Sequence, residues 1–326
     1  MNVLVTGGSG FLGQRLLRAL CARAVMLDAD GTSRPIARIA TLDFAGVPAD
    51  AVDDPRVTYV QGDLADPATL ETAFADGVDS VFHLAAVVSG AAEADFDLGM
   101  RVNVDGSRAL FEACRHSGRR PVVVFASSVA VFGGALPAVV ADSTIPAPQS
   151  SYGVQKLIGE LLLGDYSRRG TLDGRAVRLP TIVVRPGRPN AAASSFASGI
   201  IREPLAGVEA ICPVASDTAL WLMSPDTAID NLLHAHDVGS DAWGTQRAVS
   251  LPGLTVTVAE MIDALRLVGG EAAASRVHFV EDEQIARIVY GWPARFDAAR
   301  AVALGFTRDT DIVSVVRAYA CATTRS

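Results

Sequence analysis

Two kinds of hydrophobic segment alternate along the chain. One is a short continuous apolar run, and the other has apolar residues at helical spacing. A run at residues 3–5 is followed by Leu12, Leu16, Leu17 and Leu20, which lie on one face of a helix. Further runs of strand character lie at residues 25–28, 57–60, 80–86, 122–126 and 177–184. Helical patterns separate several of them, at residues 67–74, 91–117 and 151–167. Strands alternating with helices predict an α/β fold with a doubly wound parallel sheet.

The regular alternation weakens in the last third of the chain. Short strand patterns at residues 219–224 and 248–251 stand among helical patterns at 225–236, 258–267, 282–290, 297–304 and 312–320. We therefore expect a dinucleotide-binding core over residues 1–175, with a strand at 176–185 returning to its sheet. Residues 186–326 are expected to form mainly a smaller substrate-binding lobe, with some elements returning to the core.

Glycines interrupt the chain between the first strand and the first helix, at Gly7, Gly10 and Gly13. The first permits a tight turn, the second lets the backbone approach a pyrophosphate, and the third lets helix and strand pack closely. The N–H groups at the helix N-terminus then face the phosphates, with the positive end of the helix dipole behind them. A strand, turn and helix without a ligand would share this pattern, but the flanking elements favour a dinucleotide-binding unit of the Rossmann type.

The acid expected to contact the adenosine ribose is Asp28, which ends the strand pattern at residues 25–28. A carboxylate there accepts hydrogen bonds from the ribose hydroxyls and repels a 2′-phosphate, which favours NAD over NADP. Arg34 weakens this exclusion of NADP, and a turn aspartate is the alternative role for Asp28. The connection that follows, residues 31–56, is long and uneven and can hold a short strand at residues 36–42.

Polar and small residues follow the third and fourth strand patterns. Asp63 comes after the third strand, where it can meet the adenine amine or cap a turn. Ala85 and Ala86 end the fourth strand and leave room for a cofactor against the backbone, whereas His83 inside that strand is expected to be packed. Ser89 opens the next loop and can face a substrate or solvent. In a doubly wound sheet, these strand ends line the ligand crevice.

Three polar residues form the expected catalytic group. Ser127 ends the fifth strand, and Tyr152 and Lys156 lie four residues apart on one face of a helix. As a base near neutral pH, a tyrosine needs its pKa lowered by about three units, and a neighbouring ammonium favours the phenolate. Ser127 can bond the substrate hydroxyl, and Tyr152 can remove its proton while hydride leaves the same carbon. Lys156 can also bond the nicotinamide ribose.

The composition excludes several classes of function. The formal charge is −8 and the pI is about 5.1, with no basic stripe, so nucleic acid is not an expected partner. The sequence has no run of about eighteen apolar residues, and its N-terminus enters a strand at once. We therefore expect a cytoplasmic protein without a signal peptide or membrane span. The four cysteines form no metal-binding spacing, and a small anionic substrate is compatible because local arginines can outweigh the overall charge inside a cleft.

Several of these segments together resemble one known family. They are residues 7–13, 62–64, 83–86 and 127–128, with Tyr152 and Lys156. This pattern resembles the extended short-chain dehydrogenases/reductases, which include nucleotide-sugar epimerases and dehydratases, and it covers essentially the whole chain. The resemblance implies that Asp63 and Leu64 flank the adenine and that Asn103 supports the active site. It also implies cofactor contacts from Phe11, Leu12, Leu84, Ala85 and Ala86.

Longer strings at residues 85–90, 95–101, 178–187 and 190–204 resemble the members of this family that oxidise D-erythronate. By that resemblance, the substrate is a small sugar acid whose C2 hydroxyl is oxidised to give 2-oxotetronate, with NAD as the hydride acceptor. Ser89 and Asn190 are then expected at the substrate. Arg185, Arg188 and Arg202 are the candidates for binding the substrate carboxylate, and Arg185 is the first choice because it directly follows a strand.

Two other functions are compatible with the same motifs. One is a nucleotide-sugar epimerase or reductase of this family, and the other is a dinucleotide sensor without catalysis. Residues 128–130 lack the acid that a dehydratase uses for elimination, and the intact Ser, Tyr and Lys set argues against a sensor. The resemblance also implies a homodimer built through the helix of Tyr152 and Lys156, where Leu157, Leu161 and Leu162 can serve the interface or the core.

Overall fold

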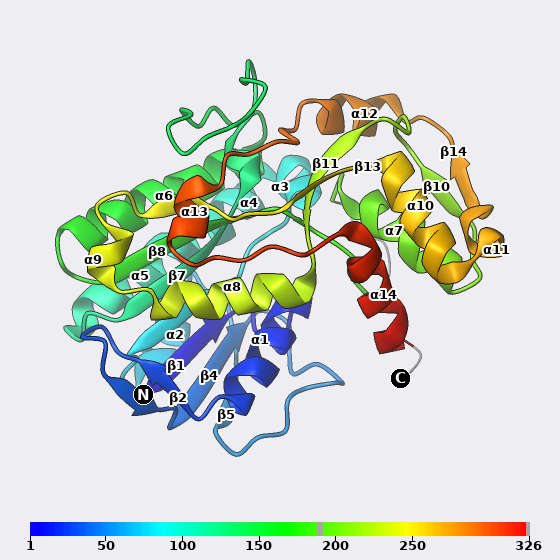
Figure 1. The fold of residues 1–326 in the computed structure, drawn as a ribbon. Helices are drawn as coiled ribbons and strands as arrows, with labels where there is room; N and C mark the ends of the chain where they lie inside the picture. The colour runs from blue at the N-terminus through cyan, green and yellow to red at the C-terminus, as the bar shows by residue number, and fades with distance from the viewer. Residues whose placement is uncertain (188–191, 324–326) are drawn as a thin grey trace.

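The computed structural model describes residues 1–187 and 192–323, and its largest feature is a seven-stranded parallel sheet (Figure 1). Its strands are β1 (Asn2–Thr6), β4 (Arg38–Asp43), β5 (Val57–Gln61), β6 (Ser80–His83), β7 (Val122–Ser128), β8 (Asp173–Leu179) and β12 (Ala248–Ser250). Their order across the sheet is β12-β8-β7-β6-β1-β4-β5, so successive connections run in opposite directions from β1. The doubly wound α/β fold is confirmed, and the carboxyl ends of β1 and β6 form its switch point.

Helices cover both faces of this sheet. On one face lie α1 (Phe11–Ala22) and α8 (Pro225–Asp237), and on the other lie α2 (Pro67–Phe74), α5 (Ser107–Ser117) and α6 (Ser151–Arg168). The alternation of side chains along β1 explains both layers. Val3 and Val5 belong to the apolar cluster of Leu16 in α1, whereas Leu4 belongs to the cluster of Phe111 and Leu163. None of the helices in the described ranges is long and apolar enough to cross a membrane.

A smaller lobe lies beside the main sheet, at the right of Figure 1. It contains β9 (Thr181–Ile182), α7 (Ser195–Leu205), β10 (Ala210–Cys212), β11 (Ala219–Met223), β13 (Leu254–Thr257), α10 (Val258–Gly269), α11 (Glu271–Ala274), β14 (Val277–Phe279), α12 (Glu283–Tyr290) and α14 (Ile312–Thr323). Val183, Ile200, Met261 and Val316 belong to its separate apolar core. The intervening α8 and β12, with α9 (Ser240–Trp243) and α13 (Ala299–Ala303), pack with the main sheet instead.

The second strand pattern does not enter the main sheet. β2 (Val25–Leu27) pairs antiparallel with β3 (Ser33–Pro35) in a separate hairpin. The ammonium of Met1 donates to the Pro35 carbonyl at 2.6 Å, so the hairpin lies at the amino edge of the sheet, beside the N-terminus in Figure 1. The prediction of a sheet strand at residues 25–28 is therefore wrong. The strand next to β1 is β4, inside the connection where only a short strand was expected.

The predicted helix at residues 91–117 is divided into four parts. These are α3 (Ser89–Ala94), α4 (Phe96–Gly99), a π-helical segment at Met100–Gly106 and α5. Asn103 is buried in the π-helical segment, where its amide bonds the backbone of the loop after β6. The buried amide thus has the partners that a polar group in a core requires, the Val87 backbone and the Gln155 side chain.

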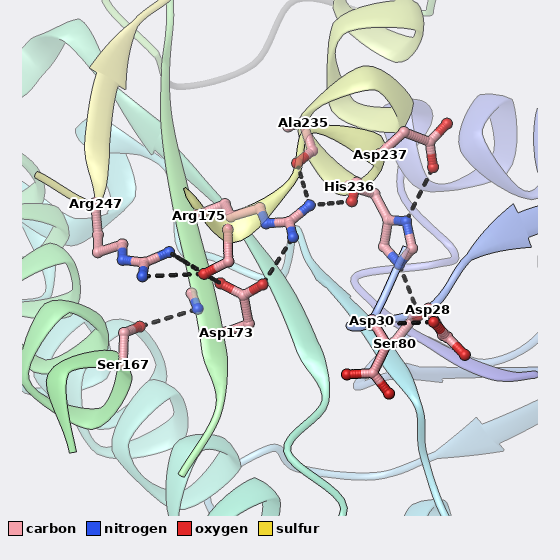
Figure 2. Close-up of polar contacts among 12 residues, drawn as sticks. Asp28, Asp30, Ser80, Ser167, Asp173, Arg175, Ala235, His236, Asp237 and Arg247 are labelled. Carbon is pink, nitrogen blue, oxygen red and sulfur yellow. Dashed lines mark hydrogen bonds and ion pairs between the residues drawn. The ribbon is translucent and has the colours of Figure 1, made fainter. Parts of the chain in front are cut away.

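A buried polar network fastens α8 to the amino ends of β6 and β8 (Figure 2). Asp173 accepts hydrogen bonds from Arg175 at 2.7 Å and from Arg247 at 2.9 Å. Arg175 also donates to the backbone carbonyls of Ala235 and His236, and the His236 ring bonds the Ser80 hydroxyl at 2.7 Å. These charges are paired with one another at the edge of the sheet opposite the switch point, away from the strand ends expected to bind a ligand.

Candidate functional site

A cavity of about 1780 Å³ is lined by the carboxyl edge of the main sheet and by the lobe. Its lining contains most of the predicted site residues: Gly7, Gly10, Phe11, Leu12, Gly13, Leu84, Ala86, Ser89, Ser127, Tyr152, Lys156 and Arg185. Asp63 and Leu64 follow β5 at the same sheet edge, and the backbone of Ala85 packs against Gly7. Asn190 lies outside the described residues. The fold thus gathers residues from distant parts of the sequence around one space.

The glycine turn after β1 is shaped for close backbone approach. Gly7 has φ +75°, and a Cβ there would lie 2.7 Å from the Ala85 nitrogen. A Cβ on Gly13 would collide with the carbonyl of Gly7. Within the described chain, no side chain caps the N-terminus of α1 at Gly10, and its first turn carries no acid. The free N–H groups at this end of the cavity suit an anionic group such as a pyrophosphate.

The acid that contacts the glycine turn is Asp43, at the end of β4. Its carboxylate accepts a hydrogen bond from the Ser9 N–H at 3.0 Å. Asp28 instead lies in the β2–β3 hairpin, where its carboxylate accepts from Arg34 at 2.5 Å and from the Thr32 N–H at 2.9 Å. The Arg34 hydrogen bond lowers the pKa of Asp28. The prediction that Asp28 meets the ribose is therefore wrong, because the hairpin carries it to the other edge of the sheet.

Tyr152 and Lys156 project from the first two turns of α6, as predicted. The Ser150 hydroxyl caps this helix by accepting from the Gly153 N–H at 3.2 Å. The Lys156 Nζ lies 5.7 Å from the centre of the Tyr152 ring and donates to the Ala126 carbonyl at 2.9 Å. Burial raises the pKa of Tyr152 to about 12 and lowers the pKa of Lys156 to about 8. Without a ligand, the phenol is therefore held in its neutral form.

Ser128, rather than Ser127, lies beside the phenol of Tyr152. The Ser128 hydroxyl forms a hydrogen bond that opposes the rise in the Tyr152 pKa. Ser127 donates instead to the Glu160 carboxylate at 2.5 Å, and this carboxylate also accepts from Arg178. Successive residues of a strand point to opposite sides, so only one of the two serines can face the phenol. Both serines line the cavity, so the contact of Ser127 with a substrate hydroxyl stays a prediction, and Ser128 is a second candidate for that contact.

Arg185 places a partly buried guanidinium in the cavity near Tyr152. Its Nε donates to the Ile182 carbonyl at 3.1 Å and its Nη2 to the Ser194 hydroxyl at 2.9 Å. Burial lowers the pKa of Arg185, and its positive charge in turn opposes the rise in the Tyr152 pKa. Arg202 donates to the Arg185 carbonyl at 2.7 Å and so supports this segment from behind. The other candidate, Arg188, lies outside the described residues.

Comparisons with known proteins place the chain in a family. The model described as the NAD dependent epimerase/dehydratase family matches residues 3–239. The chain belongs to this family. It is 58% identical over 319 residues to the D-erythronate dehydrogenase of Cupriavidus necator, with 98% of each chain covered. It is 43% identical to the protein of the same name from Haemophilus influenzae, again with 98% of each covered.

A solved structure has the same fold as this chain over nearly its whole length. The crystal structure titled as the nucleoside-diphosphate-sugar epimerase from Agrobacterium tumefaciens matches with a TM-score of 0.91 and 42% identity. The match covers 98% of this chain and 93% of that one. As a member of the NAD dependent epimerase/dehydratase family, the chain uses a nicotinamide dinucleotide. Its glycine turn and the uncapped start of α1 fit that group, because both offer N–H donors to phosphate.

His83 and Asn103, two buried polar residues near the carboxyl edge of the sheet, form hydrogen bonds within the protein. His83 bonds the hydroxyls of Thr6 at 2.7 Å and Ser107 at 2.9 Å, and burial lowers its pKa to about 3. It is a packed, neutral histidine, as its place inside a strand pattern predicted. Asn103 accepts from the Val87 N–H at 2.8 Å and donates to the Val87 carbonyl at 3.0 Å. The loop that leads from β6 to Ser89 is thereby held against the core.

The two serines at the end of β7 give a prediction that separates their roles. Ser128→Ala is expected to lower kcat about 10²-fold, because it removes a hydrogen bond from the phenol of Tyr152, the predicted base. Ser127→Ala is expected to lower the free energy of unfolding by about 1–3 kcal/mol through the Glu160 contact, with a much smaller effect on kcat. Steady-state kinetics and chemical unfolding of both variants check this. A larger kcat loss in Ser127→Ala would support the assignment made from sequence.

Proposed function

We propose that this protein oxidises the C2 hydroxyl of D-erythronate to 2-oxotetronate, with NAD as the hydride acceptor. The observation that carries the proposal is the partly buried Arg185 guanidinium, which lines the cavity near the Tyr152 phenol. In a 2-hydroxy acid, the reacting hydroxyl is one carbon away from the carboxylate. A cation for the carboxylate beside a base for the hydroxyl therefore matches this class of substrate. The names of the relatives from Cupriavidus necator and Haemophilus influenzae support the same substrate.

Each residue of the site has a defined task in this proposal. Arg185 binds the carboxylate and orients C2, and Ser128 forms a hydrogen bond to the C2 hydroxyl. Tyr152 removes the proton from that hydroxyl, and Lys156 stabilises the phenolate that must exist before this transfer. The bound nicotinamide supplies the acceptor for the hydride that leaves C2. The alcohol thus becomes a ketone, while its proton passes through Tyr152 to solvent.

The same proposal assigns the cofactor contacts. The glycine turn and the start of α1, including Phe11 and Leu12, hold the pyrophosphate. Asp63 and Leu64 flank the adenine, and the residues from Leu84 to Ala86 lie along the cofactor. Lys156 bonds the nicotinamide ribose, and Asp43 takes the role at the adenosine ribose that sequence reasoning gave to Asp28.

Asp43 is expected to set the preference for NAD over NADP. Asp43→Ser should lower kcat/KM for NAD by about 10–100-fold, because a charged acceptor for the ribose hydroxyls is lost. The same change should raise kcat/KM for NADP, since it removes a negative charge that repels the 2′-phosphate. Asp28→Ser is the matched control and should change neither value. Kinetics with both cofactors measure the effect, and a switch caused by Asp28→Ser alone would contradict it.

The substrate assignment is tested by NADH formation from purified protein, NAD and D-erythronate. L-erythronate, the threonates and UDP-galactose serve as alternative substrates in parallel reactions. Strong NADH formation with D-erythronate alone supports the proposal. Conversion of UDP-galactose without net NADH would replace it by an epimerase, and absence of turnover with every compound would favour the sensor.

We also propose a homodimer formed through α6. Val154 and Leu161 are 42% and 67% exposed, and they lie seven residues apart on one face of this helix. Leu157 and Leu162 instead pack against the apolar clusters of the subunit. An exposed apolar stripe on a long surface helix suits burial against a second copy of the chain.

A further inference from the structure

We propose that Glu160, held by Arg178 and Ser127, is a positioning residue that keeps Lys156 protonated next to Tyr152. The three residues form a buried group behind the cavity: Glu160 and Arg178 are only 4% and 6% exposed at their side chains. The Arg178 guanidinium donates to both carboxylate oxygens of Glu160, at 2.9 Å and 2.7 Å. Ser127 adds a third donor at 2.5 Å. Glu160 thus accepts hydrogen bonds from a guanidinium and a hydroxyl, which fixes its carboxylate one helical turn from Lys156.

The sheet register explains why these side chains converge. Ser127 of β7 lies directly opposite Arg178 of β8, so the two side chains leave the sheet on the same side. Glu160 lies one helical turn after Lys156 on α6, and both side chains therefore face β7. Consecutive residues of β7 then bind consecutive turns of the helix. The Ala126 carbonyl accepts from Lys156, and the Ser127 hydroxyl donates to Glu160.

Among the charges around Lys156, the carboxylate of Glu160 opposes the effect of burial on the pKa of this lysine. Burial lowers the pKa of Lys156, and among the described residues only the charge of Glu160 is found to oppose this effect. The other titratable groups facing it are Tyr152 on the same helix and His83 on β6, and both are neutral. Arg178 on β8 is a cation and cannot favour a second positive charge. Without Glu160, the buried Lys156 ammonium would keep the Ala126 carbonyl and the face of the Phe125 ring at 4.8 Å, but no opposite charge.

The sequence adds an independent argument for this role. Lys156 is the only lysine in the chain, and every other basic side chain among the 28 lysines and arginines is an arginine. Arginine stays charged at any working pH, whereas a buried lysine readily changes its pKa. The single lysine therefore stands where a side chain with an adjustable pKa is useful. Its ammonium is compact, and the neighbouring groups set whether it is protonated. This proposal rests on the proposed function in one respect, namely that the Lys156 ammonium stabilises the phenolate of Tyr152.

The single lysine also allows a direct test. Protein labelled with ¹³Cε-lysine has one lysine signal, so NMR titration of the protein without cofactor or substrate reports the protonation of Lys156 alone. In the unchanged protein we expect a pKa near the value of about 8. In Glu160→Gln we expect a fall of about one unit or more, because an opposite charge is removed.

Asp173→Asn is the matched control. It neutralises another buried acid paired with an arginine of β8, about 16 Å from Arg178 along the strand. This variant should leave the Lys156 titration unchanged. An equal shift in both variants, or a folded Glu160→Gln with an unchanged titration, would overturn the proposal.

A second variant covers the case in which Glu160→Gln does not fold. Glu160→Gln combined with Arg178→Met avoids a buried guanidinium without its carboxylate, and the Lys156 pKa should again fall. If this double variant also fails to fold, the pair serves folding and the proposal is wrong. The titration needs no turnover, so it separates the two claims. A shifted Lys156 signal without D-erythronate oxidation would sustain this inference and overturn the substrate assignment.

Discussion

Tyr152→Phe is expected to lower kcat on D-erythronate by about 10²–10⁴-fold, the usual contribution of a positioned general base. The change removes only the phenolic oxygen, so the ring keeps its place beside Lys156 in the cavity wall. NAD affinity should change little, because the glycine turn and Asp43 are untouched. Steady-state kinetics and NAD titration by fluorescence measure the two quantities separately.

Tyr166→Phe provides the matched control on the same helix. Tyr166 also belongs to α6, and its pKa is also raised to about 12, but its hydroxyl bonds Glu112 on α5. This variant should retain kcat. If Tyr166→Phe lost as much activity as Tyr152→Phe, the loss would reflect damage to α6 rather than removal of a base.

Arg185→Met is expected to lower kcat/KM for D-erythronate by about 10²–10³-fold. A guanidinium that the bound substrate would cover opposite its carboxylate is lost, and truncating one partner of such a pair costs about 2–5 kcal/mol. The loss should appear in both KM and kcat, because Arg185 also opposes the rise in the Tyr152 pKa. Measurements across a range of D-erythronate concentrations resolve the two parts.

A neutral substrate analogue tests the reason for that loss. The amide of D-erythronate keeps the hydroxyls but carries no negative charge, so Arg185→Met should reduce its turnover much less than that of the acid. Arg185→Lys keeps the charge without the planar fork and should fall between the two. An equal loss for acid and amide would mean that Arg185 supports the local structure instead of binding a carboxylate.

The sheet, the glycine turn and the Tyr152–Lys156 pair could be predicted from the sequence because each follows from local spacing. Buried parallel strands are short apolar runs, and residues four apart on a helix share a face whatever surrounds them. The glycine turn, the ends of the strands and the helix of Tyr152 and Lys156 all contribute residues to the cavity at one edge of the sheet. Prediction therefore succeeded where a motif carries its own geometry.

The acid beside the glycine turn and the choice between two serines depended on longer-range structure. Asp28 and Asp43 both end apolar runs, and nothing in the local sequence tells which run joins β1. The apolar residues before Asp43 make it a second candidate, but only the pairing of β4 with β1 separates it from Asp28. Ser127 and Ser128 differ only in which side of β7 they face, which depends on the pairing with Arg178 and on Glu160 from α6. Side-chain direction at a strand end is a property of the assembled sheet.

The β2–β3 hairpin offers a practical attachment point on the enzyme. Its tip, at Asp30 and Gly31, is exposed, and a Cβ on Gly31 would have no neighbour within 4 Å. Exposed loop tips of this kind accept inserted sequence readily. Because the hairpin lies at the amino edge of the sheet, a tether there would point away from the cavity mouth. The protein could therefore be immobilised, or fused to a partner that regenerates its oxidised cofactor, without obstructing the entry of substrate.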